Sequence, residues 1–207
     1  MSPVSAASTE TADDIRKAAL RLFARNGYDA TSMREIAGAV GIQAGSLYNH
    51  FPSKEEILWD LTRGALLDLQ GKVGRALEAL PADATPCDRL VAFVDAHVRF
   101  HAINSEKARL VNRQMPGLDK GHYREVVTLR HTFEDRLGEI LGDGVSRGDF
   151  VLVDERITVY AILQMSIAVS TWYRRGGDLS VEDVSALYVD LALRMVMRPS
   201  DTGAGPA

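Results

Sequence analysis

The sequence predicts an all-α fold, and three observations support this prediction. Apolar residues recur every three or four positions over long windows. No stretch shows the strict alternation of apolar and polar residues that is typical of a half-buried strand. Hydrophobic residues make up 46% of the chain and charged residues 25%, as in an ordinary globular protein. The 207 residues suffice for one large domain, or for a small domain followed by a medium one.

Start and stop signals divide the chain into about nine helices. The first is capped by Thr11, carries an apolar stripe that includes Ile15 and Phe23, and ends at Asn26-Gly27. Thr31 or Ser32 caps the second, with Glu35 as the partner in a capping box. Gly41 makes the turn to a short third helix in which Leu47 is buried, and Ser53–Glu56 opens the fourth.

The later helices are delimited in the same way. Pro81–Pro86 breaks the chain, Thr85 caps the fifth helix with Pro86 at its first position, and Pro116-Gly117 stops the sixth. Gly176-Gly177 ends the eighth and Ser180 caps the ninth. The expected helices cover approximately residues 12–25, 33–40, 44–49, 54–80, 86–103, 105–114, 120–146, 155–174 and 181–197.

Charge, cysteine content and terminal segments narrow the class of protein. The net charge is −4, and residues 1–60 and 61–207 each carry −2, so any nucleic-acid binding depends on positioning more than on bulk charge. No run of eighteen apolar residues predicts a membrane span, and the first residues lack the features of a secretory signal. The single cysteine, Cys87, excludes an intrachain disulfide and fits a reducing cytoplasm. We expect residues 1–10 and 200–207 to be disordered.

Residues Thr31–Leu58 form the most informative segment, a short helix, a glycine turn, a second short helix and an aromatic-proline exit. In a helix-turn-helix, the first helix braces against the DNA backbone and the second lies in the major groove, where each base pair shows a distinct hydrogen-bonding code. Gln43 can pair with adenine, Ala44 can touch a thymine methyl group, and Gly45 permits close approach of the backbone. Short helices joined by a glycine also occur as plain packing units.

Polar side chains flank this second helix. Tyr48, Asn49 and His50 project polar groups where phosphates would lie, and Thr31 and Lys54 stand at the two ends as phosphate clamps. The segment therefore predicts double-stranded DNA as a partner.

Residues Thr11–Gln70 resemble the DNA-binding head of the TetR family of transcriptional repressors. The matching features, in order, are Ala19–Phe23, Gly27-Tyr28, Thr31–Met33, Ile36-Ala37, Gly41-Ile42, Gly45–Phe51 and Ser53–Glu55. The resemblance implies that Thr31, Ser46, Tyr48, His50 and Lys54 contact phosphates, whereas Gln43, Ala44 and Gly45 face the bases. The chain departs from many relatives in having Ala44 where they carry lysine or arginine, which removes one cationic contact.

The same resemblance implies a head at residues 11–70 and a ligand-binding and dimerisation body at residues 71–199. The helices at 155–174 and 181–197 would pair with those of a two-fold mate in a homodimer. The sequence agrees independently, since the helix at 155–174 is too apolar for a surface helix, and Val184, Leu187, Leu191 and Met195 form an apolar stripe on the next one. The alternative is that the helix at 155–174 is the central core helix.

A second resemblance concerns residues Tyr123–Met197. Gly148–Phe150, Asp154 and Trp172–Ser180 look like a subgroup of TetR-type regulators that control fatty-acid or steroid breakdown, several of which bind acyl-CoA thioesters. The chain departs from this subgroup in having Arg175 where relatives often have proline.

Candidate effector-binding residues lie along the second half of the chain. An apolar pocket lined by aromatic, aliphatic and methionine side chains is one interpretation, and a plain hydrophobic core is the other. Arg130, with Arg109 and Arg113, is a candidate contact for a coenzyme A phosphate, unless these residues belong to a solvated charged face. The apolar candidates are Phe100, Val111, Met115, Tyr123, Phe133 and Met165.

The spacing of His97 and His101 permits metal chelation, but a helix face lining a cavity or the surface is the favoured interpretation, and we expect no metal and no cofactor. No nucleophile–base pair, phosphate-binding glycine loop or paired carboxylates predict an enzyme. The sequence therefore predicts a cytoplasmic, homodimeric repressor that binds a palindromic operator and is released by a small effector, with acyl-CoA favoured. An efflux-pump repressor with a promiscuous drug pocket is the alternative, and an enzyme acting on CoA thioesters is a remote one.

Overall fold

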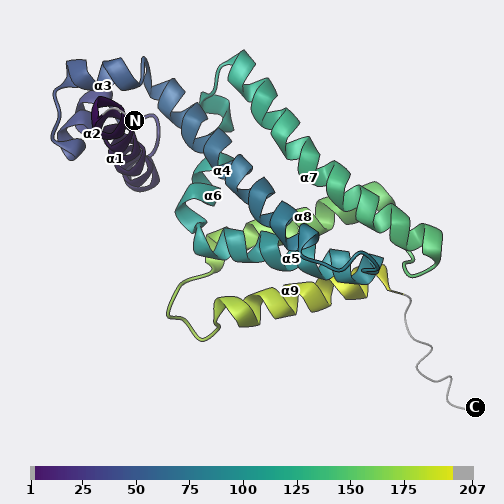
Figure 1. Ribbon diagram of the computed structural model, residues 1–207. Coiled ribbons are helices and arrows are strands. Elements are labelled where there is room, and N and C mark those ends of the chain that lie inside the picture. Colours follow the sequence, from purple (N-terminus) through teal and green to yellow (C-terminus); the bar gives the residue numbers. More distant parts are fainter. Residues whose placement is uncertain (1–2, 198–207) are drawn as a thin grey trace, which may run out of the picture. The chain divides into compact units, whose positions relative to one another are not determined.

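The computed structural model describes residues 3–197, with side chains from Glu10 onward. Within that range every regular element is helical, and Figure 1 shows their succession along the chain. The elements are α1 (Pro3–Asn26), α2 (Met33–Val40), α3 (Ala44–His50), α4 (Lys54–Glu78), α5 (Pro86–Ile103), α6 (Ser105–Arg113), the 3₁₀ turn η1 (Met115–Gly117), α7 (Lys120–Arg147), α8 (Glu155–Trp172) and α9 (Val181–Val196). The predicted fold class is confirmed.

The chain forms two compact units. We call the first the head unit, which comprises residues up to Leu67 together with Glu106–Leu129. The second is the body unit, which comprises Asp68–Ser105 and the residues from Arg130 onward. The predicted domain boundary at residue 70 lies close to Leu67, where the chain first passes from the head unit to the body unit. The chain then returns to the head unit for α6, η1 and the start of α7.

The core of the head unit is assembled from α1, α2, α3, α4 and α6. Ile15, Ile36, Leu47 and Leu58 are almost completely buried, and Leu110 of α6 joins the same cluster. Burial of each such side chain contributes roughly 1.5–3 kcal/mol relative to exposure. A Cβ atom on Gly117 would lie 2.9 Å from Cε1 of Tyr28, so η1 is seated against this core as closely as glycine allows.

The body unit is built around α5, which packs against both α8 and α9 (Figure 1). Phe93 and Val94 of α5 and Ile162 of α8 are fully buried, with Leu137 and Leu141 from α7. The end of α9 is tied back by a backbone hydrogen bond in which the Val151 amide donates to the Val196 carbonyl over 2.7 Å. The apolar sequence of α8 is therefore partly explained by burial inside one body unit.

Most predicted helix ends are confirmed, but the predicted start of the first helix is wrong. The predicted N-caps at Ser32, Thr85 and Ser180 are confirmed, and so is the predicted capping box of Ser32 with Glu35. Thr85 and Ser180 form capping boxes as well, which the sequence analysis did not predict. The first helix begins at Pro3 rather than after a Thr11 cap, so residues 3–10, which we expected to be disordered, are placed in α1. Proline is favourable at a first helical position, and the alanines that follow are strong helix formers. The helix can therefore begin before Thr11.

The predicted disorder at residues 200–207 lies outside the described residues. Over the range that the structure covers, no helix combines the length and the apolar character needed to cross a membrane.

Candidate nucleic-acid interface

The turn between α2 and α3 is fixed at both ends of α2. The Ser32 hydroxyl accepts a hydrogen bond from the Glu35 amide at 3.2 Å, and the Glu35 carboxylate accepts one from the Ser32 amide at 2.7 Å. The amide and the hydroxyl of Ser32 both donate to the Glu35 carboxylate and thereby lower the pKa of Glu35. At the other end Gly41 has a φ of +79°, a left-handed conformation that glycine adopts without strain. The two helices therefore meet at a defined angle.

The third helix, α3, is anchored by one residue. Leu47 is 0% exposed, and it is the only residue of α3 that is buried, all seven residues of this helix being described. Tyr48, by contrast, is 50% exposed. Of the predicted DNA-contacting residues on or next to this helix, Gln43, Gly45, Ser46, Tyr48 and Asn49 are exposed. Ala44 and His50 are half-buried, and Ala44 packs against the head core. Seven of the nine residues predicted to contact DNA thus lie on α3 or directly before it, and five of them are exposed.

Gly45 has no packing role within the head. A Cβ atom built on it would meet nothing within 4 Å. Glycine inside a helix costs about 1 kcal/mol relative to alanine. Neither the conformation of α3 nor its packing therefore requires glycine at this position.

Thr31 occupies a different environment from the one predicted. Its side chain is 1% exposed, and its hydroxyl donates a hydrogen bond to the Gly27 carbonyl over 2.8 Å. The hydroxyl therefore holds the turn between α1 and α2. In this conformation it has no hydrogen left to donate to a phosphate, because a threonine hydroxyl carries only one.

Lys54 is also partly committed to this turn. Its ammonium group donates hydrogen bonds to the carbonyls of Tyr28 at 2.7 Å and Asp29 at 3.3 Å, and lies 4.3 Å from the centre of the Tyr28 ring. A lysine ammonium has three donors, so one remains for a phosphate. The side chain joins the start of α4 to the turn between α1 and α2.

One residue that the sequence analysis omitted belongs to the same region. Arg34 is exposed in the first turn of α2 and forms no ion pair with any residue in the described part of the chain. Its position one turn before Gly38 places it on an accessible face of the bracing helix. Only the periodicity of α2, with Ile36 and Ala37 facing inward, could have indicated this from sequence.

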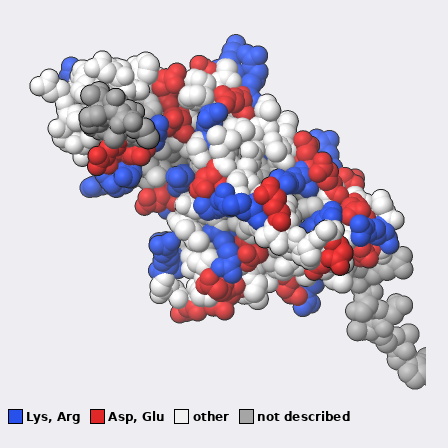
Figure 2. Space-filling view, viewed as in Figure 1, with Lys and Arg blue, Asp and Glu red and all other residues white. Residues whose placement is uncertain are grey.

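The face of the molecule drawn in Figure 2 shows no extended patch of basic side chains alone. Figure 2 shows lysine and arginine side chains interspersed with aspartate and glutamate over the displayed face. This distribution agrees with the net charge of −4.

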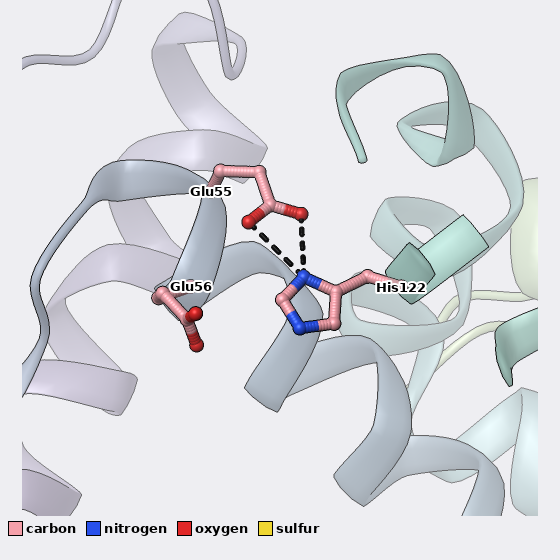
Figure 3. A group of neighbouring side chains, drawn as sticks. All are labelled: Glu55, Glu56 and His122. Atoms are coloured by element: carbon pink, nitrogen blue, oxygen red, sulfur yellow. Dashed lines mark hydrogen bonds and ion pairs between the residues drawn. The ribbon is translucent and has the colours of Figure 1, made fainter. Parts of the chain in front are cut away.

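A cluster of titratable side chains ties α4 to the start of α7 inside the head unit. Figure 3 shows the carboxylate of Glu55 facing the imidazole of His122, with Glu56 beside them. Nδ1 of His122 lies 3.0 and 3.2 Å from the two Glu55 oxygens and must carry the proton, because a carboxylate only accepts. Burial lowers the pKa of His122, but the hydrogen bond and negative charge of Glu55, with the charges of Asp119 and Glu56, outweigh burial and raise it.

This cluster is better described as an ion pair than as a metal site. Ligand atoms of Glu55, Glu56 and His122 lie within 4.8 Å of one another. They supply one ligand fewer than the four of a closed structural zinc site. The imidazole instead stacks on Trp59, with the ring centres 4.3 Å apart, and the Trp59 indole N–H donates to Glu125 over 3.1 Å. The cluster fixes the position of α7 on α4.

The predicted effector-binding residues are divided between the two units. Val111, Met115 and Tyr123 belong to the head unit, where Val111 is buried and Tyr123 is 45% exposed. The other four belong to the body unit, and these are Phe100, Arg130, Phe133 and Met165. Phe100 and Phe133 are buried.

His97 and His101 form a buried pair, whereas the sequence favoured a helix face lining a cavity or the surface over a metal chelate. His97 and His101 are 2% and 4% exposed, with ring centres 4.5 Å apart. Nδ1 of His101 donates to the His97 carbonyl over 2.8 Å, whereas Nδ1 of His97 has no hydrogen-bond partner among the described atoms. Burial lowers the pKa of both, that of His101 to about 4, so both rings are neutral at pH 7. Phe93, Phe100 and Phe133 contact these rings.

Comparison with known proteins gives consistent results for both halves of the chain. Residues 15–61 match the family model of bacterial regulatory proteins of the tetR family. Residues 83–196 match the model of the tetracyclin repressor-like C-terminal domain. The chain is 32% identical over 185 residues to the HTH-type transcriptional repressor KstR2 of Mycolicibacterium smegmatis, a match that covers 87% of this chain and 88% of that protein.

Solved structures agree with these matches. A bacterial regulatory protein of the tetR family from Rhodococcus RHA1 has a TM-score of 0.85 at 31% identity, covering 90% of this chain and 97% of that one. The ketosteroid transcriptional regulator KstR2 of Mycobacterium tuberculosis has a TM-score of 0.82 at 25% identity, covering 91% and 95%. The helix-turn-helix in the head unit, the helical body unit and these matches show that the chain belongs to the TetR family and is a DNA-binding transcriptional repressor of the KstR2-like type.

Proposed function

We propose that the protein is a homodimeric repressor that binds a palindromic operator and is released from it by a CoA thioester derived from fatty-acid or steroid breakdown. The observation that carries the DNA-binding part is the surface of α3, on which Leu47 alone is buried and Gly45 has no packing role. Since the tetR family model describes bacterial proteins, the place of action is the cytoplasm, where the DNA lies.

The proposal of a dimer is supported by exposed apolar side chains on the last two helices. Leu187, Leu191 and Met195 recur every four residues along α9 and are 52%, 48% and 40% exposed. Ile157 and Trp172 of α8 are exposed as well. Apolar stripes of this extent mark interfaces, and a two-fold dimer presents its recognition helices about 34–36 Å apart, one turn of DNA.

The proposal of an effector is supported by the buried histidine pair of the body unit. A buried polar atom without a partner, such as Nδ1 of His97, is unfavourable unless a further group donates to it. The aromatic rings of Phe100 and Phe133 around the pair suit an apolar acyl or steroid group. The relative named a ketosteroid regulator supports the same ligand class.

The mechanism follows from linkage. An effector that binds more tightly to a dimer whose heads are wrongly spaced for DNA lowers operator affinity, with a coupling free energy of about 1–3 kcal/mol. The ligand need not touch the DNA-binding surface.

The test begins with selection of the operator from a random DNA pool. Fluorescence anisotropy then measures release of that operator by acyl-CoAs of several chain lengths, a steroid-ring CoA thioester, the matching free acids, CoA alone, and a panel of cationic drugs. Release by a thioester but not by its free acid is expected. Release by drugs alone would contradict the proposed ligand class in favour of an efflux-pump repressor, and release by nothing would contradict the proposal of ligand response.

A further inference from the structure

A groove lined by arginines runs between α1 and α6 within the head unit. Its volume is about 480 Å³, within the range of small-molecule sites. Arg21 and Arg25 line it from α1, and Arg109 and Arg113 line it from α6. Its remaining lining residues are Phe23, Ala24, Gly27, Glu106, Leu110 and Gln114.

None of these four arginines has the aspartate partner that six other basic residues have on their own helices. Elsewhere, basic side chains bridge to an aspartate three or four residues earlier, and this is true of Arg16, Lys17, Lys72, Arg99, Arg147 and Arg194. In the groove, Arg25 has Arg21 at that spacing and Arg113 has Arg109. None of the four forms an ion pair with a residue of the described chain, and Glu106, one turn before Arg109, does not bridge to it.

The helix dipole explains the positions of only two of the four arginines. Arg25 and Arg113 stand in the last turns of their helices, where a positive charge is favourable. Arg21 and Arg109 lie a turn earlier and gain little from this effect. Like charges at a spacing of four residues destabilise a helix, and here two such pairs line one groove. An anion bound in the groove would attract all four arginines and so offset the repulsion between them.

We propose that this groove binds the phosphate groups of a nucleotide-type small molecule. Planar guanidinium groups match the oxygens of phosphates in paired hydrogen bonds, and four of them suit a ligand with more than one phosphate. Phe23, Ala24 and Leu110 add an apolar portion to the lining. If the proposed function holds, the ligand is the phosphate-bearing portion of a CoA thioester. A free nucleotide carries the same kind of phosphate groups.

Ligand binding in this groove has a direct route to the DNA-binding helices. Leu110 lies between Arg109 and Arg113 in α6 and belongs to the same buried cluster as Ile36 of α2 and Leu47 of α3. A phosphate held by arginines of both helices fixes α6 relative to α1. It thereby sets how Leu110 packs beneath the helix-turn-helix.

Isothermal titration calorimetry of the full-length protein without DNA tests the site, using CoA, dephospho-CoA, ADP, pyrophosphate and inorganic phosphate as probes. Arg109→Gln/Arg113→Gln is expected to weaken CoA binding by at least about tenfold, since two charge-assisted contacts are lost. Arg174→Gln/Arg175→Gln removes the same charge from an exposed turn and should leave affinity unchanged. Glu106→Gln should tighten binding. Thermal unfolding of each variant verifies that it is folded.

The outcomes separate this inference from the proposed function. Equal CoA affinity in wild type and Arg109→Gln/Arg113→Gln overturns the groove while leaving an acyl-CoA effector possible elsewhere. Groove-dependent binding of ADP and pyrophosphate without any effect of CoA thioesters on operator binding supports the groove and overturns the effector class. Inorganic phosphate binding as tightly as CoA overturns the nucleotide assignment. Loss of operator affinity in the unliganded variant assigns the groove to DNA phosphates and overturns the inference.

Discussion

At the scale of single residues, the interface depends on a small number of side chains with clearly different environments. Leu47 anchors α3, whereas the hydroxyl of Thr31 and two donors of Lys54 are used to hold the turn beside it. The side chains left for DNA are those on the outer side of α3, with Gln43 as the base reader that the sequence predicts. Their arrangement makes stability and recognition separable by mutation.

Replacing Gly45 by alanine should separate these two properties. Because a Cβ atom at Gly45 meets nothing within 4 Å, the variant should be more stable by about 0.5–1 kcal/mol, yet its operator affinity should fall at least about tenfold as the methyl group meets the DNA. Urea denaturation and fluorescence anisotropy measure the two effects. Gly38→Ala is the matched control, since Gly38 in α2 is equally open, and it should gain stability without losing affinity. Equal affinity of all three proteins would refute the close approach.

Acidification should destabilise the body unit through its histidine pair. Burial lowers the pKa of His101 to about 4, so between about pH 6.5 and 4 the unfolded chain binds the proton and the folded chain does not. The free energy of unfolding should therefore be constant above about pH 6.5 and fall below it by about 1.4 kcal/mol per pH unit for this group. His97 contributes with the same sign.

Urea denaturation at pH 7, 6 and 5 measures this slope. His101→Asn keeps a donor for the His97 carbonyl and removes the titrating group, so its slope should be shallower than that of wild type. Identical slopes would show that His101 is not the group responsible.

At the scale of elements, local sequence signals determined most helix ends. Ser32, Thr85 and Ser180 were recognisable as N-caps because each stands directly before a helical apolar pattern, and at Ser32 the box partner Glu35 lies only three residues further on. The start of α1 was missed because Thr11 offered a good cap, while the competing helix propensity of residues 3–10 is weak at each position and matters only as a sum.

Removing the cap of α2 should weaken the head without altering its DNA-facing side chains. Ser32→Ala leaves the Glu35 amide without its hydrogen bond and should lower the free energy of unfolding by about 1 kcal/mol. Ser46→Ala, on the exposed side of α3, should change it by less than about 0.5 kcal/mol. Urea denaturation of both variants checks the difference, and similar losses would show that the cap is not what stabilises α2.

Residues far apart in sequence show where prediction from sequence failed. Three tertiary contacts have no signal in the local sequence. They are the hydrogen bond between Glu55 and His122, the hydrogen bond from Lys54 to the Tyr28 carbonyl, and the packing of Leu110 in the head core. The helix-turn-helix, by contrast, is local, so its two helices and glycine turn were predicted from the sequence. The arginines of α6 were noted from sequence, but only folding places them opposite those of α1.

At the scale of the whole molecule, function is proposed to depend on two copies of the chain. Leu187→Glu/Leu191→Glu places charges in the exposed stripe of α9 and should convert the dimer to a monomer, because two like-charged pairs would be buried in the interface. Light scattering after size exclusion measures the mass. Glu182→Gln, outside the stripe, serves as the control. A wild-type protein that is already monomeric would refute this assignment.

The most direct test of the central claim is a chemical footprint of the protein on its selected operator. The account predicts protection of the major groove in two symmetric half-sites whose centres lie one helical turn, about 34–36 Å, or a whole multiple of it apart. Protection should disappear from both half-sites together in Gly45→Ala. A single asymmetric protected patch, or protection spread evenly along the duplex, would contradict a dimer that reads DNA through the outer side of α3.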